Sequence, residues 1–412
     1  MMPIMTEHAG AAASSPLAGV RIIEIASFVA VPLAGMTLAQ LGADVIRVDP
    51  IAGPADYHRW PLADSGTSIY WTGLNKGIRS VAVDLRGDDG QRLVRELIAS
   101  AGVLITNVVG RQWHSYDELV SERPDLIHVE ILGRADGTTG VDYTVNAGVG
   151  FPMVTGPAGH AGPINHALPA WDVACGLYAA LGVSAALHHR DRTGQGSRMS
   201  LALENVALAT AGSLGFLTEP MVTDRERPRL GNALYGQYGQ TFTSADGVDF
   251  MVVALTGRHF RDLVDVTGAT KAVAALADAL EVDFADEGDR FGHREVLGGL
   301  FADWFRRHDA ATIEAELTAT SILWERYRSF GEVAAGPRVT ANPLFDTLDQ
   351  PGVGPYHAAG SPLAIDGAHP RAAAAPALGA DTATVLTELL GLSDAQIRRL
   401  EQDGVVATAR PR

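Results

Sequence analysis

The stretch GVRIIEIASFVAVPLAGMTLAQLGADVIRVD, residues 19–49, decides the fold. Its two short apolar runs, residues 20–26 and 45–48, are typical of buried strands. Between them, Pro32 suits the first turn of a helix that ends near Gly42. A strand, a helix and a second strand in this order form the repeating unit of a parallel sheet, which we therefore expect here.

The same alternation continues along the chain. Short apolar strands are predicted at residues 80–85, 103–106 and 126–131, and an amphipathic helix at residues 88–100. This helix carries an apolar face made of Leu93, Val94, Leu97 and Ile98. We therefore predict an α/β protein whose large domain is a Rossmann-like, mostly parallel sheet with helices on both faces.

A second, smaller domain of the α+β kind is predicted after the pattern changes near residue 215. Residues 223–229 are mostly charged or polar and predict a linker, and a hairpin is expected around residues 245–248. Residues 255–330 have mainly helical patterns. The predicted organisation is a disordered start (1–15), the first part of the large domain (16–222), the small domain (223–335) and a return to the large domain (336–412).

The composition limits the partners and the compartment of the protein. The 412 residues are 47% hydrophobic, enough for a large core, and the formal charge of −16 disfavours nucleic acid or an anionic membrane as a partner. The single cysteine, Cys175, excludes an internal disulfide and suits a reducing, cytoplasmic location. No run reaches the roughly 18 uninterrupted apolar residues of a membrane helix, and the N-terminal residues lack the pattern of a signal peptide.

Several common cofactor and catalytic motifs are absent from the sequence. The first predicted strand is followed by Ser27 and Phe28 rather than by Gly-x-Gly-x-x-Gly, so a nicotinamide or flavin site is not expected. The chain has no Walker loop, no Cys-x-x-Cys and no His-Glu-x-x-His, and it gives no support for nucleotide hydrolysis or a metal site. Gly-x-Ser-x-Gly is also missing, which argues against a serine hydrolase.

Asp172 stands out because it lies near the start of a long apolar run, LPAWDVACGLYAALGVSAALHHR, residues 168–190. The run predicts a buried helix, and its spacing makes Cys175 a small core residue rather than a nucleophile. A carboxylate at this place either caps the helix or takes part in chemistry. The residues alone leave both interpretations open. If Asp172 begins the helix, the amide dipoles there favour its ionised form.

The segment around Asp172 and several others resemble the class III CoA-transferases, the group that includes formyl-CoA transferase and α-methylacyl-CoA racemase. The matching segments follow one another in order along nearly the whole chain: PLAGVRIIEIA (16–26), VPLAGM (31–36), LGADVIRVDP (41–50), NKGIRS (75–80), VDL (83–85), Asp172 with its helix, RTGQG (192–196) and PALG (376–379). The resemblance implies that Asp172 is the catalytic nucleophile and that the substrates are an acyl-CoA and a small carboxylic acid. It also implies a homodimer of interlocked rings, a topology that patterns alone would not suggest because chain connections normally avoid threading.

Coenzyme A is the only cofactor that the resemblance implies. By position, Val29, Ala30, Asn107 and Val108 match family residues that line the CoA site, so we expect them to contact CoA. Arg47 and Arg79 are the expected phosphate partners, because guanidinium binds phosphate with two hydrogen bonds, although each is equally consistent with a solvated surface charge. A family arginine falls on Ser115 here, and Arg111 is the candidate that replaces it.

A narrower similarity within the family lies in FVAVPLAGMTLAQLGAD (28–44), VDYTVN (141–146), LPAWD (168–172) and RPRLGNALYG (227–236). It implies that CoA moves from one carboxyl of mesaconate, a dicarboxylic acid, to the other within one molecule. The residues proposed to hold the diacid are Tyr143, Thr144, Asn146, Tyr235, Gln237 and Tyr238. The loop at 236–239 either covers the active site or is only a turn before the hairpin. His166 is expected to be a packed or solvated histidine rather than a base.

Two other reactions remain open at this point. One is CoA transfer to a separate acid, and the other is racemisation of a 2-methylacyl-CoA. A racemase needs a second acid/base group, and the histidine that supplies it in the family falls on Val141 here. The adjacent Asp142 is expected to point elsewhere on an extended strand. The residues therefore favour transfer over racemisation.

Overall fold

The computed structural model describes residues 15–409, which fold into two compact units. Unit 1 contains the described residues of Met1–Val149, His166–Gly215 and Pro337–Arg412, and unit 2 contains Gly150–Asn165 and Phe216–Gly336. The main part of unit 2 thus begins a few residues before the predicted linker. Unit 2 also includes Gly150–Asn165, which the prediction assigned to the large domain. All but the last residue of the predicted disordered start lies outside the described residues.

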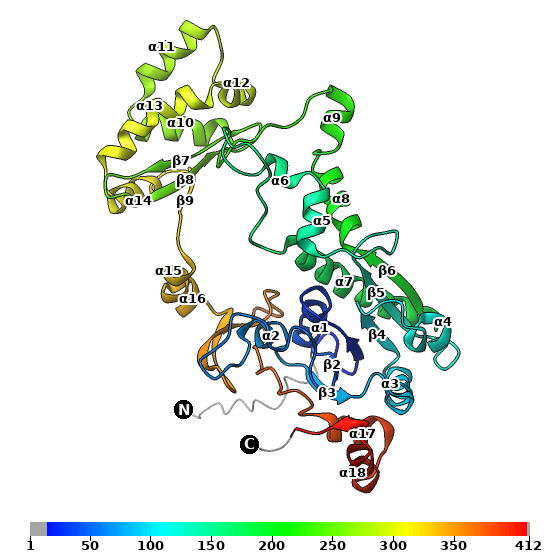
Figure 1. The fold of residues 1–412 in the computed structure, drawn as a ribbon. Helices are drawn as coiled ribbons and strands as arrows, with labels where there is room; N and C mark the ends of the chain where they lie inside the picture. Colours follow the sequence, from blue (N-terminus) through cyan, green and yellow to red (C-terminus); the bar gives the residue numbers. More distant parts are fainter. Residues whose placement is uncertain (1–14, 410–412) are drawn as a thin grey trace, which may run out of the picture. The chain divides into compact units, whose positions relative to one another are not determined.

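Unit 1 is built on one seven-stranded sheet with the strand order β12-β3-β2-β1-β4-β5-β6 (Figure 1). Its neighbours are parallel except for β12, which pairs antiparallel with β3, so the predicted mostly parallel sheet is confirmed. The strands are β1 (Arg21–Ile25), β2 (Asp44–Pro50), β3 (Arg79–Val83), β4 (Val103–Thr106), β5 (Ile127–Leu132), β6 (Ser197–Ala202) and β12 (Val406–Ala407). The direction of the strand order reverses at β1, between β2 and β4. Ligands of such sheets bind at this place, beyond the carboxyl ends of the strands.

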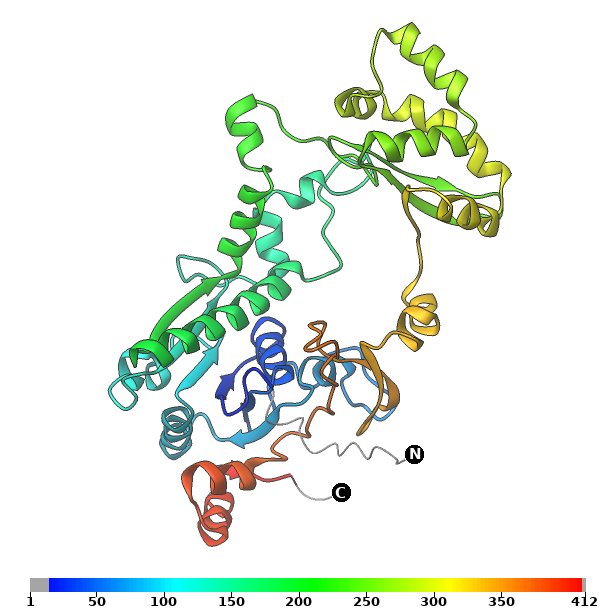
Figure 2. The ribbon, with the colours of Figure 1, turned by 180° about the vertical axis from the view of Figure 1, so that it is seen from behind.

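Helices cover both faces of this sheet. On one face, α3 (Asp88–Ala101), α17 (Thr382–Leu390) and α18 (Asp394–Gln402) share a hydrophobic core with β1 to β4. The four apolar residues predicted for one face of α3 are all buried there. On the other face, α1 (Ala30–Gln40) packs against α7 (Ala170–Thr193), which runs along β5 and β6 (Figure 2). α7 is long and apolar enough to cross a membrane by length and composition, but in this unit it packs as a core helix.

The remaining elements of unit 1 are short. They are α2 (Ile69–Leu74), a 3-10 turn (Gln112–His114), α4 (Tyr116–Leu119), α5 (Asp142–Gly148), α8 (Leu203–Ser213), α16 (Pro337–Thr340) and the hairpin of β10 (Phe345–Gln350) with β11 (Gly354–Ala359). α2 and α5 matter for function because they and the loops before them border the carboxyl end of the sheet.

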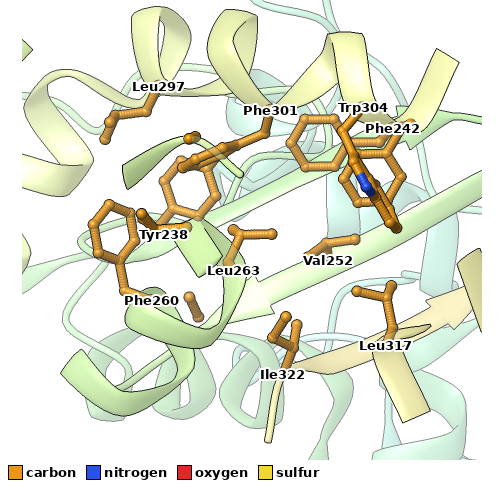
Figure 3. Packing of buried hydrophobic residues seen from close by; sticks show 14 of the residues in the cluster. Tyr238, Phe242, Val252, Phe260, Leu263, Leu297, Phe301, Trp304, Leu317 and Ile322 are labelled. Atoms are coloured by element: carbon orange, nitrogen blue, oxygen red, sulfur yellow. The ribbon is translucent and has the colours of Figure 1, made fainter. Parts of the chain in front are cut away.

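Unit 2 is an antiparallel sheet covered by helices, as the α+β prediction requires. The sheet contains β7 (Tyr238–Thr243), β8 (Asp249–Ala254) and β9 (Leu323–Arg326), and the predicted hairpin around residues 245–248 joins β7 to β8. The helices are α6 (Phe151–Val154), α9 (Thr218–Thr223), α10 (Gly257–Val266), α11 (Thr270–Leu280), α12 (Glu287–Gly292), α13 (Arg294–Arg307), α14 (Ala310–Thr318) and α15 (Phe330–Ala335). Aromatic side chains, among them Phe242, Phe260 and Phe301, fill the core (Figure 3). The rings of Phe242 and Phe305 stack with centroids 4.4 Å apart.

Candidate active site

A cavity of about 810 Å³ lies beside Asp172 in unit 1. Four segments form most of its wall: the loop after β1 (Ser27 to Ala30), the loop before α2 (Arg59 to Pro61), the start of α5 (Val141 to Tyr143) and the start of α7. All of them gather at the carboxyl end of the parallel sheet, where the strand order reverses. The position agrees with that of ligand sites in open α/β sheets.

Asp172 does not cap its own helix. It is the third residue of α7, whose N-cap, Pro169, has no side-chain hydrogen bond. The amides of Trp171 and Asp172 donate instead to one oxygen of Asp142, at 2.7 and 3.1 Å. Asp142 therefore stabilises the start of α7, and the carboxylate of Asp172 is left to line the cavity. Of the two interpretations of Asp172, the structure excludes the cap.

The environment of Asp172 raises the pKa of its carboxyl to about 7. Burial is the main cause, and the negative charge of Asp142 adds to it, while the guanidinium of Arg59 acts in the opposite direction. The expectation that the helix start favours the ionised form is therefore outweighed. One turn further, the Cys175 thiol is buried and its pKa is raised to about 12, so it remains a protonated core residue.

The prediction for Asp142 is wrong. Asp142 is not on an extended strand but is the first residue of α5, and it is buried in the wall of the same cavity. Its second oxygen lies 2.7 Å from Nε2 of His166, whose side chain is mostly buried. Two amides and an imidazole thus engage the carboxylate of Asp142. These contacts make it a structural partner of Asp172 rather than a free acid/base group.

The residues proposed for the diacid separate into distinct environments. Tyr143 lines the cavity, and its hydroxyl donates to the carbonyl of Ala167 at 3.2 Å. Thr144 instead bonds to the backbone of Val141 at the start of α5. Asn146 is buried and accepts a hydrogen bond from the indole N–H of Trp171 at 3.0 Å, so it supports the wall from behind.

The three remaining diacid candidates belong to unit 2. The prediction for Tyr238 is wrong, because this residue is fully buried in the core of unit 2, where its ring packs against Phe260 and Phe301. Its position at the first residue of β7 accounts for this. Gln237 donates to Glu287 at 2.5 Å, and Tyr235 is exposed with its ring over the guanidinium of Arg227. Gly236 adopts a φ of +75° two residues before β7, a backbone conformation that glycine accepts readily in a turn.

A second cavity of about 800 Å³ lies beyond the carboxyl ends of β1 to β4. Val108 and Arg111 line it, whereas Val29, Ala30 and Asn107 line the cavity of Asp172. Ser27 belongs to the walls of both cavities. The side-chain amide of Asn107 holds Ser27 in place by accepting from its N–H at 3.1 Å and donating to its carbonyl at 2.9 Å. Five of the seven predicted CoA contacts are therefore found at two adjoining cavities.

The structure contradicts the prediction that Arg47 binds phosphate. Its side chain is fully buried on β2, and its guanidinium contacts the carboxylates of Asp49 and Asp56 at 3.0 and 3.3 Å and the side-chain oxygen of Asn75 at 3.0 Å. A buried Glu24 carboxylate lies 3.7 Å away, and burial raises its pKa to about 7. The sequence could not reveal that Arg47 is buried and paired, because the apolar residues around an arginine in a strand do not show whether its side chain meets buried acids or solvent.

Arg79 is also badly placed for a phosphate in this cavity. It begins β3, while the cavity lies beyond the last residue of that strand, Val83. Its guanidinium is paired with Asp44 at 2.6 Å and with Glu388 at 2.7 Å. The basic side chains that do line the cavity are Arg86, three residues after the end of β3, and Arg111. Arg86 was missed, although its position just after a parallel strand was a usable signal. Arg59 was missed too, and no local pattern marks it.

Known proteins are similar to this chain in sequence and in fold. The sequence profile of CoA-transferase family III matches residues 17–382. The 2-methylfumaryl-CoA isomerase of Chloroflexus aurantiacus is 46% identical over 95% of this chain and 98% of that protein. The succinate–glutarate CoA-transferase of Agrobacterium fabrum is 30% identical over 91% of this chain and 96% of that protein. The crystal structure of a CAIB/BAIF family protein from Brucella suis matches with a TM-score of 0.75 at 26% identity, over 91% of this chain and 99% of that one. This chain belongs to CoA-transferase family III.

Proposed function

We propose that the protein moves CoA between the two carboxyl groups of 2-methylfumarate (mesaconate) within one molecule. The observation that carries this proposal is the 46% identity with a 2-methylfumaryl-CoA isomerase along nearly the whole of both chains. The structure supports it, because the carboxylate of Asp172 does not cap its helix and lies in the wall of a cavity. This cavity is found where the strand order of the sheet reverses. No metal, nicotinamide or flavin is required by the steps below.

In the first half of the reaction, an oxygen of Asp172 attacks the thioester carbonyl carbon of the acyl-CoA. The carbon–sulfur bond breaks, CoA leaves as a thiolate, and a mixed anhydride of aspartate and acyl group remains. The thiolate then attacks the aspartyl carbonyl carbon and breaks its bond to the bridging oxygen. The products are an aspartyl–CoA thioester and a free diacid with two carboxylates. Covalent catalysis of this kind replaces one difficult displacement by easier steps.

In the second half, the other carboxylate of the same diacid attacks the aspartyl thioester and releases the thiolate. The thiolate attacks the acyl carbonyl carbon of the new anhydride, which restores the Asp172 carboxylate and leaves CoA on the other carboxyl group. No proton is gained or lost in the cycle. Asp172 must be ionised at the first step, and a pKa of about 7 makes the carboxylate available near neutral pH while keeping it more basic than a solvated aspartate.

The second cavity is the proposed site of the nucleotide end of CoA. Arg86 and Arg111 supply positive charge for phosphates there, and Trp113 supplies an aromatic face for the adenine. Because Ser27 borders both cavities, a pantetheine arm that passes this residue leads from one cavity to the thioester beside Asp172. Val29, Ala30 and Asn107 line the Asp172 end of this path.

A homodimer in the cytoplasm is also proposed. α7 exposes a group of apolar side chains, and Leu177, Tyr178 and Leu181 are 50, 54 and 63% exposed in the single chain. Such a patch on a core helix is typical of a protein–protein interface. The free thiol of Cys175 fits a reducing compartment. Light scattering of the purified protein should give twice the mass of 43.4 kDa.

The decisive test of function is incubation of purified protein with one regioisomer of 2-methylfumaryl-CoA and no added acid. Appearance of the other regioisomer supports the proposal. If conversion requires an added dicarboxylic acid, the protein is an intermolecular transferase, a function that the relative from Agrobacterium fabrum favours. If instead a saturated 2-methylacyl-CoA takes up deuterium at its α-carbon in heavy water and the regioisomers stay unchanged, the protein is a racemase.

A further inference from the structure

Arg59 is the basic side chain of the Asp172 cavity. Among the described residues that line this cavity, no other arginine, lysine or histidine is present. Within residues 15–409 its guanidinium takes part in no ion pair, although two carboxylates, Asp142 and Asp172, belong to the same wall. It lies over two aromatic rings instead, 4.9 Å from the ring centre of Tyr70 and 5.4 Å from that of Phe28. Contact through the ring faces leaves the N–H edge of a guanidinium available to a ligand.

The backbone that carries Arg59 is fixed on both sides. Three residues before it, the carboxylate of Asp56 is held by the buried guanidinium of Arg47 at 3.3 Å. The hydroxyl of Ser68 donates to the carbonyl of Arg59 at 2.5 Å, and the amide of Ile69 donates to the carbonyl of Pro61 at 2.9 Å. Arg59 is thus presented to the cavity from an anchored loop, and less ordering is needed when a ligand binds.

We propose that Arg59 binds the carboxylate of the substrate that is not attached to CoA. This inference rests on the proposed function and adds the group that selects a dicarboxylic acyl-CoA. A guanidinium binds a carboxylate with two parallel hydrogen bonds. In a cavity whose wall already carries two aspartates, the positive charge of Arg59 is needed to attract a further carboxylate. An acyl-CoA without a second carboxylate gains nothing from Arg59.

The same contact explains why transfer stays within one molecule. After the first half of the reaction the diacid is no longer covalently attached, and both its carboxylates are free. Arg59 then retains the diacid by one carboxylate while the other faces the aspartyl–CoA thioester. When the diacid turns round, Arg59 holds the carboxylate that has just lost CoA. Without this retention the diacid escapes, and any acid from solution takes its place.

The test compares wild type with R59M and R59K, and with R92M as a control on the surface of α3, where Arg92 pairs with Asp89 and Glu96. For isomerisation of 2-methylfumaryl-CoA, R59M should lose roughly 10- to 100-fold in kcat/KM, mostly through KM, as expected when a charged hydrogen bond is removed. R59K should recover part of the loss, and R92M should behave as wild type. Affinity for free CoA, measured by calorimetry, should be unchanged in R59M.

A second measurement separates retention from a merely structural role. Carbon-13-labelled 2-methylfumarate is added during turnover, and label in the acyl-CoA is followed by mass spectrometry. Wild type should incorporate almost none, and R59M should incorporate label. The methyl ester of the substrate, which has no second carboxylate, should acylate Asp172 at equal rates in wild type and R59M when hydroxylamine is used as the trap.

Three results would overturn the proposal: wild-type kcat/KM in R59M, loss of CoA affinity, which would make Arg59 a phosphate ligand, or equal slowing with the methyl ester, which would make it structural. If wild type does not isomerise the substrate at all, the proposed function fails independently. Calorimetry of free 2-methylfumarate with the CoA-bound protein then decides, because equal affinities of wild type and R59M would reject the role of Arg59.

Discussion

The carboxylate of Asp142 accepts the backbone amide of Asp172 at 3.1 Å, although 30 residues separate them in the sequence. The same oxygen accepts the amide of Trp171 at 2.7 Å, and the other oxygen meets His166. One aspartate thus takes over the helix-capping role and also places a negative charge near the second aspartate. This relationship frees Asp172 for chemistry, and the charge of Asp142 adds to the rise in the pKa of Asp172 that burial mainly causes.

Replacing Asp172 with alanine or asparagine should remove the nucleophile and leave the cavity intact. Turnover should fall at least about 100-fold, a loss of several kcal/mol in transition-state stabilisation, while CoA affinity stays within about threefold. D191N, near the far end of α7, is the matched control and should retain full activity. During turnover, hydroxylamine should modify Asp172 in wild type only when acyl-CoA is present, as read by peptide mass spectrometry. An alanine variant with more than a hundredth of wild-type activity would show that Asp172 is not the nucleophile.

The pH dependence of kcat/KM should show an acid limb with an apparent pKa near 7, because only the ionised Asp172 attacks the thioester. D142N removes the neighbouring negative charge and keeps an oxygen that accepts the two amides of α7. The limb should therefore move to lower pH, by roughly one unit. The limb of D142N is compared with that of D191N, which should match wild type. An unchanged limb in D142N would mean that Asp142 does not influence the ionisation of Asp172.

The stability of D172N relative to wild type should also depend on pH, in a specific direction. Since the folded-state pKa of Asp172 is raised to about 7 from 3.8, the native state holds this proton more tightly than the unfolded chain. The contribution of Asp172 to the free energy of unfolding therefore falls as pH rises through that window and is lowest above pH 7. D172N should gain stability over wild type at pH 8 relative to pH 6, by about 1 kcal/mol. Urea unfolding at the two pH values measures this, and a gain that is the same at both would contradict it.

Arg47 and Arg86 should give opposite results when each is replaced by methionine. R47M leaves three buried carboxylates without their cation and should cost about 3–5 kcal/mol in the free energy of unfolding. R86M removes an exposed charge from the second cavity and should change stability by less than about 0.5 kcal/mol, while it weakens CoA binding roughly 10-fold. Urea unfolding and calorimetry with CoA separate the two effects. Weakened CoA binding by a fully stable R47M would restore Arg47 as a phosphate ligand.

The sequence by itself predicted β1 to β5, α1 and α3 of unit 1, the hairpin of β7 and β8 in unit 2 and the place of Asp172 near the start of α7. It did so because apolar spacing, Pro32 in the first turn of α1 and the turn residues around 245–248 act over a few residues. Resemblance to a family extended this to CoA and to five residues found at the two cavities. These properties depend on local patterns or on residues matched one by one.

Only the tertiary structure decided which polar residues are buried together and which face a cavity. Arg47 meets Glu24 because β1 and β2 pair with these two residues in register, and Gly35 on α1 makes room for Glu24: a Cβ on Gly35 would lie 1.9 Å from an oxygen of Glu24. Asp142 reaches α7 across 30 residues, and Arg59 enters the cavity on a loop anchored by Arg47 and Ser68. The same side chain is a surface charge, a buried ion pair or a ligand depending on desolvation and on partners that are distant in the chain. These two quantities exist only once the elements have packed.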